Sequence, residues 1–100
     1  MAGRSVDHVD YNALAQAGVD YGNAAIQIDD LLKKLDSTNS LLAGAWQNDT
    51  SDAFLERFER EYRPAMKSLE ESVGSLSSYL KKYIDVHQNE DRQKAAAVRG

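Results

Sequence analysis

Apolar and small residues recur at alternating steps of three and four along two long stretches of this chain. The first row comprises Tyr11, Leu14, Gly18, Tyr21, Ala25, Ile28, Leu32, Leu35, Asn39, Leu42 and Trp46. The second comprises Phe54, Phe58, Tyr62, Ala65, Leu69, Val73, Leu76, Leu80, Tyr83 and His87. This alternation is typical of helices that pack along a heptad seam, and it differs from the period of two that a strand shows. The pattern predicts an all-α fold.

A polar segment, QNDTSD at residues 47–52, separates the two helical stretches. Asn and Asp tolerate the left-handed backbone region that a tight turn demands, and we expect Asn48 to adopt it. The second helix would be capped by one of three polar residues, Asp49, Thr50 or Ser51. Asp52 would lie in its first turn, where the helix dipole favours an acid. The chain is therefore predicted to be a long antiparallel helix-turn-helix hairpin.

The periodicity also sets the expected boundaries of the hairpin. It covers residues 10–92, with the turn near residues 46–50. Residues 1–9 and the basic residues 93–100 are expected to be flexible ends, as chain termini commonly are. Within the second helix, Pro64 removes one backbone hydrogen bond, but the apolar pattern resumes after it. We therefore expect one continuous, kinked helix rather than a helix break.

The apolar surface of each helix is wider than a single neighbouring helix can cover. A second row, formed by Ala17, Ala24 and Leu31, lies beside the main seam at heptad spacing. Two hairpins that pair into a four-helix bundle would bury both rows. Asn39 occupies a seam position, where a buried polar side chain can set the register of pairing. The sequence thus predicts a dimer, with a second copy or with a related hairpin.

Composition excludes several classes of protein. The net charge of −4, without a basic stripe, argues against nucleic-acid binding. The absence of cysteine rules out disulfides and thiolate metal sites, and no apolar run approaches the roughly 18 residues of a membrane span. The first ten residues contain one Arg and no apolar segment, so they are not a signal peptide of the general secretory type. Synthesis in the cytoplasm is expected.

No arrangement of residues in the sequence suggests catalysis. Neither histidine lies next to a candidate nucleophile, and there is no glycine-rich phosphate loop, so we expect no enzyme activity. His8 and His87 would approach each other at the open end of the hairpin, among several acids, which is a conceivable zinc site. Solvated charges near chain ends explain the same residues more simply. We therefore expect neither a metal nor a cofactor.

The segment around the single tryptophan resembles a known family. AWQNDTSDAFLERF, residues 45–58, is similar to the pattern of a Trp, one residue, a Gly, a pair of small residues and an aromatic residue that opens the second helix. This is the pattern of the WXG family, the ESAT-like small proteins of type VII secretion, and the resemblance spans roughly residues 5–92. Asn48 stands where the family has Gly. The family's second helix is similar to Pro64 and the apolar residues after it, namely Ala65, Leu69, Leu76 and Leu80.

The resemblance implies a function in protein recognition. It implies a substrate or adaptor of a bacterial type VII system, secreted or held at the cell surface without a signal peptide, with a role in virulence or in competition between bacteria. The implied partners are a second helical hairpin, the secretion ATPase motor and a larger toxin. One alternative is a non-exported adaptor or chaperone that pairs with the helical N-terminal domain of such a toxin. Another is a purely structural coiled coil.

The resemblance also singles out candidate recognition residues. The family's C-terminal secretion signature is a Tyr followed four residues later by an acid, whereas here Tyr83 is followed by His87. His87 and Asp91 have the required spacing and form the candidate motif, with an imidazole in place of the phenol. Trp46 would either fill the end of the bundle or form a surface together with the C-terminal motif of the second subunit. The basic tail is an alternative signal that the motor would bind as a helix in a groove.

Overall fold

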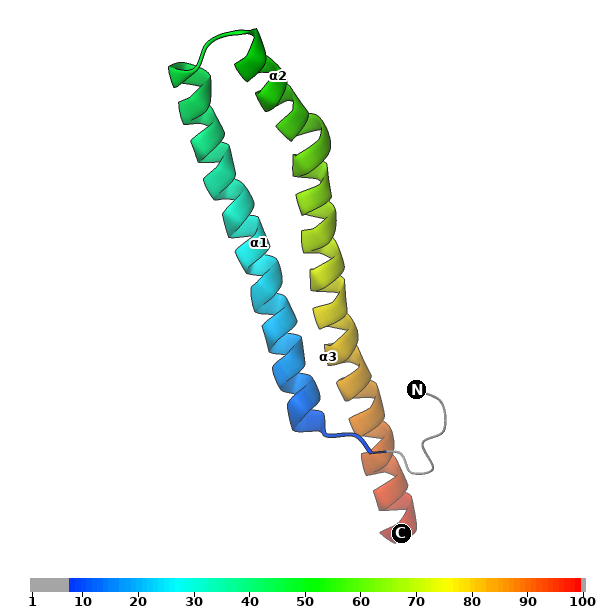
Figure 1. Ribbon diagram of the computed structural model, residues 1–100. Coiled ribbons are helices and arrows are strands. Elements are labelled where there is room, and N and C mark those ends of the chain that lie inside the picture. The colour runs from blue at the N-terminus through cyan, green and yellow to red at the C-terminus, as the bar shows by residue number, and fades with distance from the viewer. Residues whose placement is uncertain (1–7, 100) are drawn as a thin grey trace.

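The computed structural model of this chain describes residues 8–99, and it is a helical hairpin. Helix α1 (Tyr11–Ala45) leads into a turn, and the second arm comprises α2 (Asp49–Arg57), the π-helical turn η1 (Phe58–Tyr62) and α3 (Arg63–Arg99). The second arm runs without interruption and returns antiparallel to α1 (Figure 1). The molecule measures 76 × 27 × 17 Å, which is the shape of a rod. The predicted all-α hairpin is confirmed.

Side chains near its two ends fix the length of α1. Asp10 is the N-cap, and its carboxylate accepts a hydrogen bond of 3.0 Å from the backbone N–H of Ala13. At the other end the backbone of Trp46 leaves the helical region, with φ −133° and ψ 92°. Its N–H still donates to the carbonyl of Leu42, at 2.8 Å. Trp46 is therefore the residue at which the first arm ends.

The second arm accommodates Pro64 with a widened turn just before it. Proline has no N–H, and its ring clashes with the carbonyl four residues back, here that of Arg60. In η1 the backbone widens by one residue, and the N–H of Arg63 donates to the carbonyl of Phe58, five residues earlier. Single π-turns of this kind are a known cause of helix bending. The expectation of one continuous helix is confirmed, and the π-turn is the adjustment that makes it possible.

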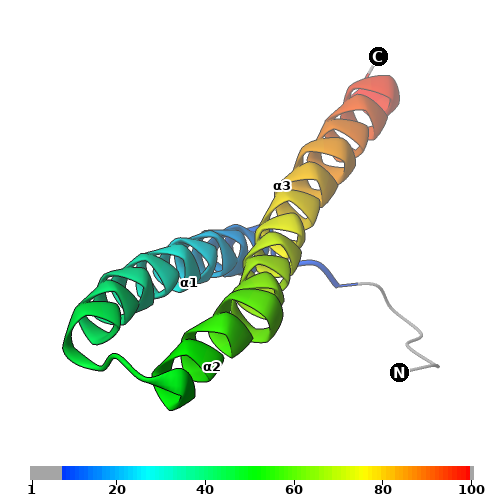
Figure 2. The ribbon, with the colours of Figure 1, turned by 90° about the horizontal axis from the view of Figure 1, so that it is seen from above.

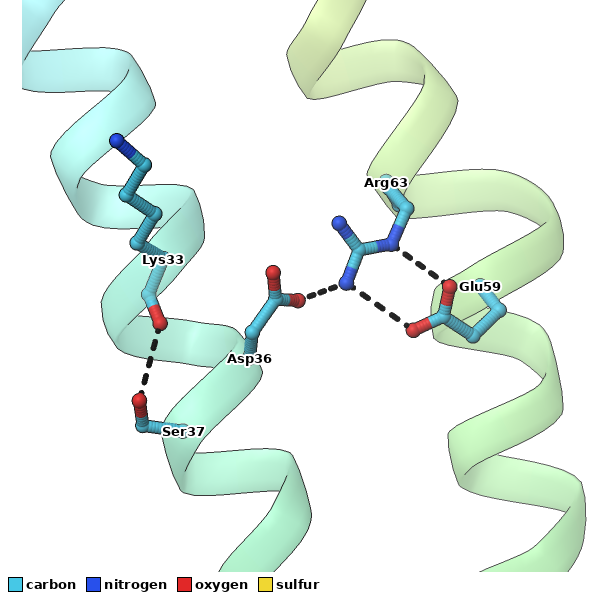
Figure 3. A network of polar contacts seen from close by, with 5 residues as sticks. All are labelled: Lys33, Asp36, Ser37, Glu59 and Arg63. Carbon is cyan, nitrogen blue, oxygen red and sulfur yellow. Dashed lines mark hydrogen bonds and ion pairs between the residues drawn. The ribbon is translucent and has the colours of Figure 1, made fainter.

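A polar network ties this widened turn to α1. The Arg63 guanidinium donates to Glu59 at 2.7 Å through Nε and at 3.2 Å through a terminal nitrogen, and it also pairs with Asp36 of α1. Figure 3 shows Arg63 between the two carboxylates, one from each arm. A planar guanidinium suits such a bridge because its donors lie in a fixed fork. Arg63 thus links the π-turn to α1 where the two arms are still separated.

The two arms approach each other most closely where small residues face each other. Seen from above, α1 and α3 draw together away from the turn (Figure 2). In that region a Cβ added to Gly22 would lie 3.2 Å from Ser77 Oγ, and one added to Gly74 would lie 4.0 Å from the Cβ of Ala25. Ser77 is only 4% exposed, and its hydroxyl donates to the carbonyl of Gly18 at 2.7 Å. Because the facing residues have small side chains or none, the two backbones can approach each other closely.

The π-turn changes which residues of α3 face α1. The sequence predicted a seam through Ala65, Leu69 and Leu76, but these three are exposed, Leu69 by 54% and Leu76 by 48%. The buried or half-buried row is instead Met66, Val73, Ser77, Leu80 and Ile84. Val73 and Leu80 belong to both rows, and further along α3 Tyr83 and His87 of the predicted row are also half-buried. The predicted seam was wrong in this part because an additional residue in the π-turn rotates the helix that follows.

Little apolar surface is fully buried within one chain. Among the residues that the structure describes, Leu32 and Phe58 alone are both apolar and buried. Large side chains that remain exposed include Tyr21, Leu31, Phe54, Tyr62, Leu69, Leu76, Tyr79 and Val86. Exposed apolar residues that lie together mark interaction surfaces more often than solvated ones. None of the described helices has the length and apolarity needed to cross a membrane.

The structure describes most of the expected C-terminal segment but little of the expected N-terminal one. Helix α3 remains helical through most of the basic tail, up to Arg99. Residues 1–7 and 100 lie outside the described residues, so the flexible N-terminal segment stays a prediction. The boundaries of the hairpin at residues 10 and 92 also stay predictions.

Candidate functional site

The turn is built differently from the sequence prediction. Asn48 has φ −158° and ψ 177°, which is extended backbone and not the left-handed region. Its side chain accepts from the backbone N–H of Ser51 at 2.8 Å, while the hydroxyl of Ser51 accepts from the N–H of Asn48 at 3.1 Å. These reciprocal bonds form a capping box at the start of α2. Asn48 is therefore the N-cap itself, and Asp49 and Asp52 both lie in the first turn.

This capping role predicts the effect of substitutions at Asn48. We expect Asn48→Ala to lower the free energy of unfolding by about 1 kcal/mol, because it removes the side-chain acceptor, and Asn48→Gly by only a few tenths. Urea unfolding followed by circular dichroism measures both changes. Thr50→Ala, at an exposed position of the same turn, is the control and should be near neutral. A clear gain in stability from Asn48→Gly would contradict the cap and favour a left-handed turn.

Trp46 is half-buried at the end of the first arm. Its indole lies against the ring of Phe54, with ring centroids 5.9 Å apart and planes inclined by 51°. This tilted arrangement is favourable for aromatic rings and holds the indole beside the first turns of α2. Phe54 itself is 48% exposed. The turn end of the rod thus has two adjacent aromatic side chains, both partly accessible to a partner.

The candidate motif on α3 lies at the other end of the rod. The imidazole of His87 stacks on the ring of Tyr83, with centroids 4.1 Å apart, and its Nδ1 lies 3.7 Å from a carboxylate oxygen of Glu90. Asp91 accepts a hydrogen bond of 2.8 Å from the phenol of Tyr11, in the first turn of α1. That hydrogen bond raises the pKa of the Tyr11 phenol, because it stabilises the protonated donor. The sequence placed Tyr11 in the first apolar row but gave no sign of this hydrogen bond, because nothing local marks a contact between residues 80 positions apart.

An apolar groove lies beside this open end. It has a volume of about 410 Å³ and is lined by His8, Val9, Asp10, Ala13, Leu14, Tyr79, Leu80 and Tyr83. A smaller hollow of about 230 Å³ adjoins it, shares two of its tyrosines, and also has Lys82, Val86 and His87 in its wall. Tyr79, which belongs to both, is 66% exposed. Aromatic walls with few polar groups are typical of sites that receive an apolar side chain.

Within one chain the predicted recognition residues do not come together. Trp46 and Asn48 lie at the turn, whereas His87 and Asp91 lie beside the start of α1, at the opposite end of the rod (Figure 1). An α-helix rises about 1.5 Å per residue, so the 35 residues of α1 separate the two places by about 50 Å. No single partner side chain can contact both in one hairpin. A joint surface requires a second chain.

Comparison with known proteins decides the family. Residues 8–91 match the family model WXG100, described as proteins of 100 residues with WXG. The chain belongs to the WXG100 family. An uncharacterized protein of Clostridium acetobutylicum is 29% identical to it over 69 residues, which cover 69% of this chain and 71% of that protein. The crystal structure of Geobacillus thermodenitrificans EsxA, form I, matches with a TM-score of 0.82 at 22% identity, over 92% of this chain and all of that one, and shows the same fold.

Membership of the WXG100 family sets the coarse function. Proteins of this family are small, non-enzymatic helical proteins associated with type VII secretion. In this WXG100 chain Asn48 occupies the Gly position of the motif, and its extended backbone explains how a residue with a side chain fits there. No group of three or more potential metal ligands gathers among the described residues. The surfaces described above are suited to contacts between proteins.

Proposed function

We propose that this chain is a substrate or adaptor of a bacterial type VII secretion system, and that the secretion motor recognises it as a folded, paired hairpin. The observation on which the proposal rests is the WXG100 match over residues 8–91, with Trp46 at the start of the motif. The chain would be made in the cytoplasm and leave the cell without a signal peptide of the general secretory type. Its action is recognition rather than catalysis.

Pairing is supported by a continuous apolar row on the outer side of the second arm, from the end of η1 into α3. Tyr62, Leu69, Leu76 and Tyr83 follow one another at steps of seven, and all but the half-buried Tyr83 are exposed. Steps of seven keep a row on one face of a helix, as in coiled-coil seams. The groove at the open end joins Ala13, one turn before Ala17, to Tyr79 and Tyr83. The row of α1 that contains Ala17, Ala24 and Leu31 and the exposed row of the second arm therefore lie on the same side of the hairpin. A second hairpin on that side would cover both rows.

Pairing would also complete the recognition surface. In an antiparallel pair, the turn of each hairpin lies beside the open end of the other, so that Trp46 of one chain approaches His87 and Asp91 of its partner. The motor would then contact a surface that exists only in the pair. The partner is a second copy or a related hairpin; a larger toxin with a helical N-terminal domain would pair in the same way.

A second candidate function is a non-exported adaptor or chaperone for such a toxin. The observation that favours it is His87, which stands where the secretion signature has Tyr and whose ring is already stacked on Tyr83. An adaptor needs the pairing surface but not the export signal. In this function Trp46 and the outer row stay essential, whereas the C-terminal motif is dispensable.

Export in a bacterium that has the secretion motor tests these proposals. We expect Trp46→Ala to reduce motor binding and export by about thirtyfold, the effect of losing an aromatic hot spot. His87→Ala and Asp91→Asn should also reduce export, and Asp85→Asn, an exposed acid on the same helix, should not. Tyr11→Phe removes only the hydrogen bond to Asp91 and separates that contact from recognition. Circular dichroism of each variant verifies folding.

Deletion of residues 93–100 separates the candidate motif from the basic tail. If the deletion abolishes export while His87→Ala and Asp91→Asn leave it unchanged, the tail is the signal and the assignment of His87 and Asp91 is wrong. If the wild-type chain stays in the cytoplasm when the motor is active, the adaptor function replaces that of the exported substrate. If motor binding and toxin binding are both absent, only a structural role remains.

A further inference from the structure

The hydrogen bond between Tyr11 and Asp91 lies where α3 loses its neighbouring helix. Helix α1 begins at Tyr11, whereas α3 continues to Arg99, so the last turns of α3 extend beyond the other arm (Figure 1). The side chains of residues 89–96 are all exposed. Among the described residues, no other hydrogen bond or ion pair joins α3 beyond Ser77 to α1. The phenol of Tyr11 is therefore the polar contact that fastens the end of α3 to the rest of the hairpin.

The place of Tyr11 is fixed by the start of its own helix. Asp10 is the N-cap, and its carboxylate accepts from the backbone N–H of Ala13, so Tyr11 is the first residue of a capped helix. The Tyr11 side chain is half-buried. A tyrosine has only two side-chain torsions, so it presents its hydroxyl at a low cost in entropy. The cap thus determines where the phenol meets α3.

The hydrogen bond orients the Asp91 carboxylate and still leaves part of it accessible. Only Oδ2 accepts from Tyr11, at 2.8 Å, and a carboxylate has lone pairs on both oxygens. Hydrogen bonds to charged acceptors are stronger than those between neutral groups. Exposed helix ends open with free energies near zero, so one such bond changes how often the last turns are formed. Asp91 is therefore held on a formed turn, with one oxygen free for a donor from a partner.

His87 is fixed in a different way. Its imidazole stacks on Tyr83 and lies 3.7 Å from a carboxylate oxygen of Glu90, and both neighbours belong to α3 itself. His87 and Asp91 lie on one face only while the turn between them is helical, because their spacing is four residues. The contact that holds this turn from outside α3 is the one from Tyr11. The relative placement of the two candidate recognition residues thus depends on the first residue of α1.

We propose that Tyr11 is a positioning residue for recognition of this chain, because its phenol holds Asp91 on the same face of α3 as His87. The inference rests on the proposed role of His87 and Asp91, and it adds α1 to a recognition signal that would otherwise lie on α3 alone. Tyr11 and Asp91 are 80 positions apart in the sequence. The signal is therefore complete only in the folded hairpin, and the same C-terminal residues without α1 present it poorly.

A double-mutant cycle in the full chain tests this role, with motor binding and export as the readouts. Tyr11→Phe keeps the ring and removes the hydroxyl. Export should fall by up to about fivefold, the factor by which one lost hydrogen bond shifts the opening of an end turn. Asp91→Ala should reduce export more strongly. Because Tyr11 acts through Asp91, the double variant should be no worse than Asp91→Ala alone.

Tyr21→Phe is the matched control for the loss of a phenol. Tyr21 lies on the same helix, is 42% exposed, and its hydroxyl has no hydrogen bond to a described residue, so export should stay unchanged. Amide hydrogen exchange measures the same effect without the motor. Exchange of the backbone amides of residues 88–92 should accelerate about fivefold in Tyr11→Phe and not in Tyr21→Phe, because only the former loosens the end of α3.

The outcomes separate this inference from the function on which it rests. If Asp91→Ala leaves motor binding and export unchanged, the assignment of Asp91 to recognition is wrong and the role of Tyr11 falls with it. If Asp91→Ala reduces export and Tyr11→Phe does not, only the positioning role is overturned. Additive losses in the double variant would show that Tyr11 acts independently of Asp91, which also contradicts the proposal.

Discussion

Replacing Gly22 by leucine should lower the melting temperature of this hairpin by roughly 10–20 °C, the shift that a loss of a few kcal/mol causes in a domain of this size. A Cβ at this position would already lie 3.2 Å from Ser77 Oγ, which is closer than ordinary van der Waals contact, and the rest of a leucine would force the arms apart. Ser77 is unable to turn away freely, since its hydroxyl donates to the carbonyl of Gly18 at 2.7 Å. Overpacking costs about 1–3 kcal/mol, and loss of the hydrogen bond about 1 kcal/mol.

The same substitution at Gly44 is the control for this effect. A Cβ there would have no atom within 4 Å, so the leucine meets open space. Leucine is a better helix former than glycine by nearly 1 kcal/mol, and Gly44→Leu should raise the melting temperature by a few degrees. Thermal unfolding by circular dichroism measures both variants. A similar response at the two positions would show that the close crossing of the arms at Gly22 does not support the fold.

The hairpin could be predicted because its two apolar rows are long and regular. The register of α3 could not, because the π-turn is a response to Pro64 and to contacts with α1, such as the bridge from Arg63 to Asp36. Hydrophobic periodicity also placed Gly18 and Ala25 in the seam but passed over Gly22 and Ser77. At the closest crossing the facing residues are instead Gly22 and Ser77, small residues whose value lies in letting two backbones approach.

The candidate site, too, could be predicted from the sequence only in part. Trp46 stood out as the single tryptophan beside the turn, and His87 and Asp91 were identified through the resemblance to the family's secretion signature. Their functional roles remain proposals. The cap formed by Asn48 was missed because Asn is favoured both in left-handed turns and at N-caps, and composition does not distinguish the two. The contact of Tyr11 with Asp91 depends on how the arms are aligned. Such contacts between distant segments have no local signal in a sequence.

Leu69→Lys combined with Leu76→Lys should weaken dimerisation by about a thousandfold. Both leucines are about half exposed in the hairpin, so covering them in a dimer would remove further apolar surface from water. At about 25 cal/mol per Å², roughly 1 kcal/mol is lost for each leucine, and twofold symmetry makes four such losses. Because about 1.4 kcal/mol is a factor of ten, the sum of about 4 kcal/mol corresponds to that thousandfold change. Sedimentation equilibrium over a range of concentrations measures it.

Val19→Lys combined with Ile26→Lys is the matched control. These side chains are about as exposed as the two leucines, but each lies two residues after Ala17 or Ala24, about 200° further around α1. They therefore point away from the side on which the outer rows of the two arms meet, and their replacement should leave dimerisation nearly unchanged. Equal losses in the two double variants would mean that added charge, and not a specific surface, controls association. Loss in the control alone would place the pairing surface on the other side of the hairpin, and the groove at Tyr79 and Tyr83 would then face solvent in the dimer.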